Sequence, residues 1–228
     1  MKSLKKIFDH LLIIIPAKGN SSRLKNKNIY SVGKKKLIEY TFDQIKSIGL
    51  KKNTYVSTDS DKIISLTKKN KFNFIKRPKS ISKKNSSTES AIIHAIKLLD
   101  PKLKNYKWVL TLPPTSPLRS TKTILNSFKK AKMNKFSSII SLTLNRGDFW
   151  LASSKGNYTR LFKNASRRQQ ERNFLFEETS SLYLNKIKEL IKSNSLINGK
   201  VGAVLTNKEE SLDINDLNDI NLFKALIK

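Results

Sequence analysis

The chain has 228 residues, enough to bury one sizeable core, and we expect a single domain over 1–228. It has no cysteine and two histidines, which excludes disulfides and thiolate metal sites and leaves oxygen atoms as the expected ligands of any metal. The 46 lysines and arginines outnumber the 17 aspartates and glutamates and give a formal net charge of +29, a balance typical of proteins that bind polyanions.

The positive charge is spread along the whole chain instead of being gathered in one arm. Lysine clusters recur from 34–36 to 129–130 among abundant asparagine and isoleucine, a combination that AT-rich coding favours. We therefore interpret most of the charged side chains as solvated surface residues, whose positive potential helps to capture small anions. A dedicated nucleic-acid-binding surface is the less favoured interpretation. Asp9 and His10 interrupt the cationic amino terminus, and no segment reaches the roughly 20 apolar residues that span a bilayer. We expect a cytoplasmic protein without membrane contact.

The first predicted element is a buried strand over 11–16 that leads into a polar loop. A continuous Leu/Ile run of this length is typical of a strand with both faces buried, and Pro16 ends it because proline cannot continue a central ladder. Gly19, Asn20 and Ser21 allow close backbone approach and offer hydrogen-bond donors. The pattern predicts a phosphate-binding loop, although it matches neither Walker A nor G-x-G-x-x-G, and a solvated basic turn is the alternative. Its cations are Lys18, Arg23, Lys25 and Lys27.

Strand and helix patterns then alternate along the chain. This alternation predicts an α/β fold, a Rossmann-like, doubly wound and mostly parallel sheet. Short links and right-handed crossovers would place the loops that follow the strands at one edge, where such sheets bind ligands. The expected strands lie near 53–57, 72–76, 107–112 and 137–144, and the expected helices near 36–48, 60–69, 87–99 and 120–132.

The pattern breaks between about 145 and 175, which we interpret as an excursion from the core. This segment carries Trp150, Tyr158 and the basic run 167–170. Regular order then resumes to the end of the chain. The expected elements are a strand at 181–184, a helix near 186–193, a strand near 200–205 and a helix near 215–227.

Six segments occur in register along nearly the whole chain: 15–24 with 27–28, 56–59, 77–78 with 87–88, 114–119, 168–170 and 211–215. Together they resemble the CMP-sialic acid synthetase family of cytidylyltransferases. This resemblance implies a nucleotidyltransferase fold and a Mg²⁺-dependent transfer of CMP from CTP to the anomeric hydroxyl of a 2-keto sugar acid, with release of pyrophosphate.

The resemblance also implies roles for individual residues on the nucleotide side. Lys18 and Lys27, with magnesium, would neutralise the leaving pyrophosphate, and Asp213 would complete the catalytic set. Arg77 and Thr88 fall where family members contact the base, although an Arg-Pro turn and a helix N-cap at 86–89 explain them as well. The implied nucleotide-binding residues are Ala17, Lys18, Gly19, Asn20, Ser21, Lys27, Asn28, Arg77 and Thr88.

For the metal, the resemblance implies Asp213 and Asn215 as ligands. The family usually has aspartate where this chain has Asn215, whose amide oxygen can ligate magnesium but adds no charge. Metal capture should therefore weaken unless Asp216 or Glu210 contributes. Helix capping is the alternative role for this segment.

The acceptor side departs further from the family pattern. Pro113 replaces a glutamine, and 177–183 replaces a basic-x-Asn-Gly-Ala-Ile-Tyr pattern. On the phosphate side, Lys18 replaces an arginine, which keeps the charge but loses the planar fork that grips two phosphate oxygens. By resemblance, Arg168 and Gln169 would bind the acceptor, with Arg168 gripping its carboxylate, although both also fit an exposed basic surface. We expect CTP binding to be retained with an acceptor other than N-acetylneuraminate.

The expected partners are CTP, an anionic sugar acid and a second copy of the chain. In the family, the segment that corresponds to 145–175 reaches across to a second subunit, so the resemblance implies a homodimer. An acceptor with eight carbons, a relative that has lost catalysis and a basic nucleic-acid-binding α/β protein stay open as alternatives. We interpret His94 as a core or interface histidine and Asp59 as a residue that either orients the site or begins a helix.

Overall fold

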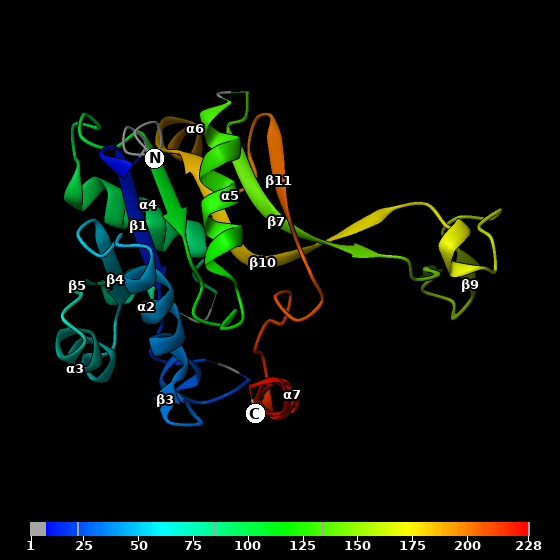
Figure 1. Ribbon diagram of the computed structural model, residues 1–228, viewed down its shortest axis with the longest axis horizontal. Helices are drawn as coiled ribbons and strands as arrows, with labels where there is room; N and C mark the ends of the chain where they lie inside the picture. The colour runs from blue at the N-terminus through cyan, green and yellow to red at the C-terminus, as the bar shows by residue number, and fades with distance from the viewer. Residues whose placement is uncertain (1–7, 22, 84, 134, 228) are drawn as a thin grey trace.

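A mixed sheet with the strand order β11-β7-β10-β6-β1-β4-β5 forms the centre of the protein (Figure 1). In the computed structural model, β1 (Leu11–Pro16) lies between β4 (Thr54–Thr58) and β6 (Trp108–Thr111) and is parallel to both. β5 (Asn73–Lys76) adds a further parallel strand beside β4. The structure describes residues 8–21, 23–83, 85–133 and 135–227.

The other half of the sheet contains a strand that runs against its neighbours. β10 (Leu175–Lys186) is antiparallel to both β6 and β7 (Ser138–Asn145), and β11 (Val201–Thr206) returns parallel to β7. The mostly parallel sheet is thus confirmed. β10 begins well before the expected strand at 181–184, because its first residues pair with the exposed end of β7 and show no apolar alternation.

Helices cover both faces of the sheet, as a doubly wound fold requires. Side chains of β1 alternate between two cores: Leu11, Ile13 and Ile15 pack in one, Leu12 and Ile14 in the other. The expected two-sided burial is confirmed. The first core contains residues of α2 (Leu37–Ser47), α3 (Asp61–Lys69) and α5 (Thr121–Lys132), and the second contains residues of α4 (Thr88–Leu99) and α6 (Ile187–Ser193).

A third apolar cluster joins the carboxyl-terminal helix to the first loop. Ile214, Ile220 and Phe223 pack against Leu24 and Val32, so α7 (Leu217–Leu226) lies beside this loop (Figure 1). This packing positions the 213–215 segment. The loop itself contains the 3-10 turn η1 (Lys27–Ile29) and leads to the short hairpin of β2 (Ser31–Val32) and β3 (Lys35–Lys36).

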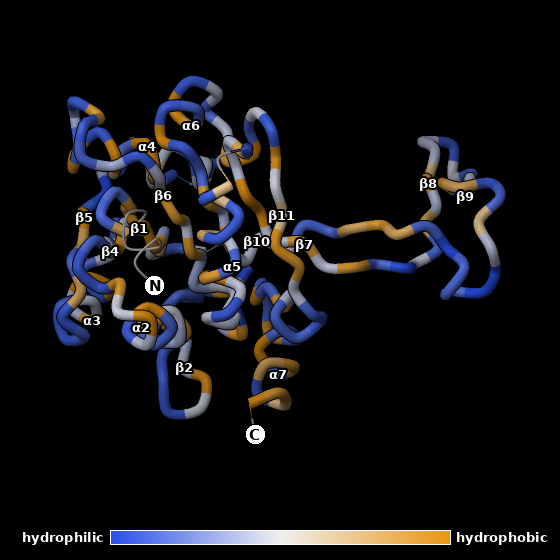
Figure 2. The backbone as a smooth tube through the Cα atoms, turned by 45° about the horizontal axis from the view of Figure 1, so that its top comes forward, coloured by the Kyte–Doolittle hydropathy of each residue, from blue (hydrophilic) through white to orange (hydrophobic). Residues whose placement is uncertain are grey.

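β7 and β10 continue beyond the sheet as a ribbon that carries residues 146–174, here named the arm (Figure 1). Asp148 and Arg160 form a bidentate ion pair in the arm, with distances of 2.8 and 2.6 Å. Figure 2 shows apolar stretches on the ribbon and in β8. The arm contains β8 (Trp150–Ala152), β9 (Tyr158–Arg160) and the 3-10 turn η3 (Gln169–Glu171).

Within the described ranges, no helix is long and apolar enough to cross a membrane.

Candidate active site

The loop that follows β1 is fixed to the loop that follows β4. Ala17 N donates to Ser57 O at 2.9 Å, and Gly19 N donates to the carboxylate oxygen Oδ1 of Asp59 at 2.8 Å. A Cβ atom on Gly19 would lie 2.8 Å from the Cβ of Ser60, so no larger residue fits here without movement. Asp59 therefore orients the loop, which is one of its two expected roles.

Two of the predicted nucleotide-binding residues lie beneath this loop. Asn28 is 5% exposed and donates through Nδ2 to Lys18 O at 2.8 Å. Arg77 is 6% exposed and donates through Nη2 to Ser57 O at 2.7 Å. Burial lowers the pKa of Arg77, and the nearby charge of Asp59 opposes this shift. Asn28 thus supports the loop backbone, and Arg77 supports the end of β4 to which the loop is hydrogen-bonded. Direct contact of either side chain with the base stays a prediction.

The loop forms one wall of a cleft of about 830 Å³, here named the nucleotide cleft. The Lys18 ammonium lines this cleft and donates a hydrogen bond to Lys83 O, in the segment after the 3-10 turn η2 (Lys79–Ile81). Thr88 contributes from the first turn of α4, which is capped by Ser87. The lining residues are Lys18, Asn20, Ser21, Arg23, Lys27, Ser82, Ser86 and Thr88.

Lys27, which lines the nucleotide cleft, contacts the 213–215 segment. Its ammonium donates to Ile214 O at 2.7 Å and to Asn215 Oδ1 at 3.3 Å. Arg23 Nη2 donates to the same Asn215 oxygen at 2.7 Å, and Asn215 Nδ2 donates to Asp213 Oδ2 at 2.8 Å. Burial lowers the pKa of Lys27, Asp213 opposes that shift, and Arg23 adds to it. The structure thus brings two of the predicted cations, Arg23 and Lys27, together with the predicted metal ligands.

The protein side chains around Asp213 provide few ligands for a metal ion. Among the described residues, no group of three or more histidine, aspartate or glutamate side chains could hold a metal. In the structure Asp216 caps α7, and Glu210 accepts a hydrogen bond from Thr123 Oγ1 at 2.6 Å. A contribution of either carboxylate to the metal stays a prediction. The side chains around Asp213 fit magnesium only as an ion that takes most of its ligands from substrate phosphates and water.

Arg119, in the loop after β6, is a buried anchor to which the sequence alone assigned no role. Its guanidinium donates to Ser181 O, to Gln44 Oε1 at 3.0 Å and to Thr41 Oγ1 at 3.3 Å. Burial lowers its pKa to about 9. A fully buried arginine cannot be inferred from composition or spacing, because its partners come from separate elements.

The predicted acceptor residues lie on the arm. Gln169 lines a second cleft of about 850 Å³ together with Asp213 and Asp219. Arg168 is exposed and pairs with Glu171 at 3.3 Å, so the structure does not bring it to the nucleotide cleft of its own chain. Its role toward the acceptor stays a prediction.

The segment 177–183 departs from the family pattern and forms an irregular bulge in β10. The register against β7 shifts between Glu178 and Tyr183, whose hydroxyl donates to the Glu178 carboxylate. Burial and this hydrogen bond raise the pKa of Tyr183. Ser180 has a φ of 54°, a left-handed conformation that favours glycine.

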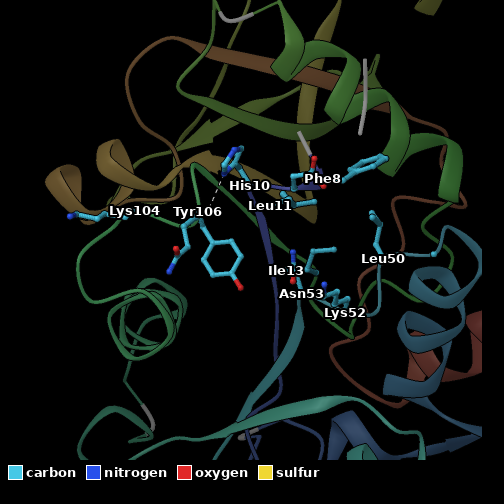
Figure 3. Close-up of a pocket in the computed structure, with 12 residues that line it drawn as sticks. Phe8, His10, Leu11, Ile13, Leu50, Lys52, Asn53, Lys104 and Tyr106 are labelled. Carbon is cyan, nitrogen blue, oxygen red and sulfur yellow. Dashed lines mark hydrogen bonds between the residues drawn. The ribbon is translucent and has the colours of Figure 1, made fainter. Parts of the chain in front are cut away.

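A further pocket of about 550 Å³ lies at the opposite edge of the sheet, at the amino end of β1 (Figure 3). Phe8 and Tyr106 line it, and His10 Nδ1 lies 3.0 Å from Asn105 O. Such sheets bind ligands at the carboxyl ends of their strands, so we do not assign this pocket to the active site.

A doubly wound sheet with a cation-rich loop and a nearby carboxylate at its carboxyl edge defines an α/β nucleotidyltransferase. Comparison with known proteins narrows this class. Residues 12–210 match the family described as "Cytidylyltransferase", and the chain belongs to that family.

Individual relatives are distant but match along the chain. An N-acylneuraminate cytidylyltransferase of Escherichia coli O18:K1:H7 is 24% identical over 93% of this chain, which spans about half (51%) of that relative. A pseudaminic acid cytidylyltransferase of Campylobacter jejuni serotype O:23/36 is 25% identical over 95% of this chain and 96% of its own length. A solved CMP:2-keto-3-deoxy-manno-octonic acid synthetase complexed with CTP shares the fold, with a TM-score of 0.70 at 10% identity, and covers 95% of this chain and 98% of its own.

Proposed function

We propose that the protein transfers CMP from CTP to the anomeric hydroxyl of a 2-keto sugar acid of the sialic-acid type and releases pyrophosphate. The observation that carries the proposal is the contact of Lys27 and Arg23, which line the nucleotide cleft, with the Asp213–Asn215 segment. Two cations and one carboxylate converge where a triphosphate and its metal would lie.

The reaction needs positioning and charge neutralisation more than covalent chemistry. The acceptor oxygen bonds to the α-phosphorus, the bond from that phosphorus to the β-phosphate oxygen breaks, and the hydroxyl proton is released. Lys18 and Lys27 stabilise the negative charge that builds on the leaving pyrophosphate. Magnesium, held by Asp213 and the phosphates, would supply further charge neutralisation. Asn28 holds the loop at Lys18 O, and Arg77 holds the adjoining end of β4 at Ser57 O.

For the acceptor, the names of the relatives favour a nine-carbon sugar acid. The two relatives quoted above act, by their names, on N-acylneuraminate and pseudaminic acid, and they match 93% and 95% of this chain. Pro113 and the bulge at 177–183 differ from the family pattern, so we propose an acceptor other than N-acetylneuraminate. An eight-carbon ulosonate is the second candidate; the solved CTP complex, which by its name makes an activated eight-carbon acid, shares the fold and does not rank the two acceptors.

The proposed site includes the arm of a second copy. Trp150, Tyr158 and Phe174 are 53%, 71% and 65% exposed on the arm of one chain, and aromatic residues of this kind are enriched in protein interfaces. In a homodimer the partner's arm would supply Arg168 to the acceptor.

Substitution of Arg168 tests its role. Arg168→Ala should raise the KM for the acceptor and leave CTP affinity unchanged, because the guanidinium would contact only the acceptor carboxylate. Arg167→Ala, a neighbouring exposed arginine, is the matched control. If CTP binding collapses in Arg168→Ala alone, the assignment is wrong.

The main test is pyrophosphate release from CTP and Mg²⁺ with a panel of sialic, legionaminic, pseudaminic and eight-carbon ulosonic acids, with ATP and UTP in place of CTP as controls. Release that requires both CTP and one acceptor class would support the proposal and name the acceptor. CTP binding without turnover would indicate a relative that has lost catalysis, and no CTP binding would overturn the proposal.

A further inference from the structure

Asn215 lies between two cations and one carboxylate. Its Oδ1 accepts from Arg23 Nη2 at 2.7 Å and from Lys27 Nζ at 3.3 Å, and its Nδ2 donates to Asp213 Oδ2 at 2.8 Å. The backbone N–H of Asn215 donates to Asp219 Oδ2 at 2.7 Å, which fixes the residue itself. Both ends of the amide thus have partners.

The partners determine the orientation of this amide. Arginine and lysine can only donate, and a carboxylate can only accept. A flipped amide would place donors against Arg23 and Lys27 and an acceptor against Asp213. The hydrogen bonds of the Asn215 amide to Arg23, Lys27 and Asp213, here named the amide bridge, therefore form in only one orientation of the amide.

The amide bridge holds the cations without neutralising them. An aspartate in this place would form charge-assisted pairs with Arg23 and Lys27 and would repel Asp213. The neutral amide positions the same two cations and adds no negative charge of its own beside them. Both cations line the nucleotide cleft.

We propose that Asn215 is a positioning residue that makes the site favour the triphosphate over a free divalent cation, so that the metal enters bound to the nucleotide. This inference rests on the proposed function, because it takes the nucleotide cleft as the CTP site. It deepens that proposal by assigning what the site binds first.

The test is Asn215→Asp, with two binding measurements that do not need the acceptor. Calorimetry with CTP in EDTA should show affinity lowered by about tenfold or more, because the new carboxylate neutralises the cations. Electron paramagnetic resonance with Mn²⁺ and no nucleotide should show affinity raised by about tenfold or more, because a second carboxylate joins Asp213. The proposal therefore predicts that Asn215→Asp lowers the affinity for CTP and raises the affinity for Mn²⁺.

Asn207→Asp is the matched control, since it adds the same charge a few residues before the site. Asn207 Oδ1 accepts from Glu210 N at 2.7 Å, a bond that aspartate preserves. The control should change neither affinity by more than about twofold. Thermal melting of both variants shows whether each is folded.

Arg23→Gln provides a second test, made both in the wild-type background and in the Asn215→Asp background. It should weaken CTP binding in the wild type and weaken it less beside Asn215→Asp, because the added carboxylate there already offsets the guanidinium charge. Equal losses in the two backgrounds, or CTP and Mn²⁺ affinities in Asn215→Asp that match the control, would overturn this inference alone. Wild-type protein that binds no CTP would overturn the proposed function as well.

Discussion

At the residue scale, Lys27 is the side chain on which turnover should depend most. Lys27 is partly buried, and its ammonium donates a hydrogen bond to Ile214 O, so the ammonium is held in place before the substrate binds. Lys27→Met should lower kcat for pyrophosphate release by about 10²-fold or more, the usual cost of losing a preorganised charge. Lys25→Met, at an exposed position of the same loop, is the control. Equal losses of kcat in the two variants would show that Lys27 acts only through the overall positive potential of the loop and not through its position.

Ser180 stores backbone strain that glycine would relieve. Its φ is 54°, and the left-handed conformation costs an L-residue roughly 1 kcal/mol. Ser180→Gly should raise the free energy of unfolding by up to about that amount, measured by urea denaturation. Asn194→Gly, at a φ of 51°, should gain less, because asparagine tolerates this conformation better. A loss of stability in Ser180→Gly would show that its side chain contributes more than the strain costs.

At the element scale, Asp100 closes the connection from α4 to β6. Its buried carboxylate accepts from Lys104 N, Asn105 N and Tyr106 N at 3.0, 2.8 and 3.0 Å. Burial alone would raise the pKa of Asp100, but these hydrogen bonds lower it below its ordinary value of 3.8. The stabilisation is therefore present above pH 3.8 and is lost as the pH falls below that value toward the lowered pKa.

Asp100→Asn should lower the free energy of unfolding by about 1–3 kcal/mol at neutral pH. Denaturation of wild type and variant across pH should show this difference shrinking in the acid range. Asp61→Asn, which removes a carboxylate that is 81% exposed, should change stability little at any pH. A difference that grows toward low pH would contradict the assigned direction of the shift.

The sequence was sufficient to predict elements whose pattern is set by burial. The expected helices at 36–48, 60–69, 87–99 and 120–132 lie within one residue of those observed, because each carries an apolar face of helical period. The early start of β10 was missed, because Glu177 and Glu178 are exposed in the ribbon.

Site contacts that depend on tertiary packing were harder to predict. Resemblance placed Lys27 and Asp213 in one site, and the structure brings them together through the cluster around Ile214. The support that Asn28 gives to Lys18 O, and the burial of Arg119, leave no periodic signal in the sequence.

At the scale of the whole molecule, the arm provides the prediction on assembly. Trp150→Ser with Tyr158→Ser should convert a homodimer to monomers in light scattering, because both rings are exposed on the single chain. CTP binding should persist, and acceptor-dependent turnover should fall. Leu205→Ser, at an exposed apolar position on β11, is the control and should leave the assembly intact. A wild-type protein that is monomeric at micromolar concentration would rule out the proposed dimer.

The apolar cluster that joins α7 to the first loop has a consequence for synthesis. Ile220 and Phe223 leave the ribosome long after Leu24, against which their cluster packs. The strands of the whole sheet are therefore translated before the segment that packs against the cation-rich loop, Ile214 to Phe223, is synthesised. A nascent chain stalled after residue 210 would contain the entire segment that matches the family and still lack Asp213 and Asn215. Only a chain that extends past Asn215 can form the contacts of Arg23 and Lys27 with the 213–215 segment.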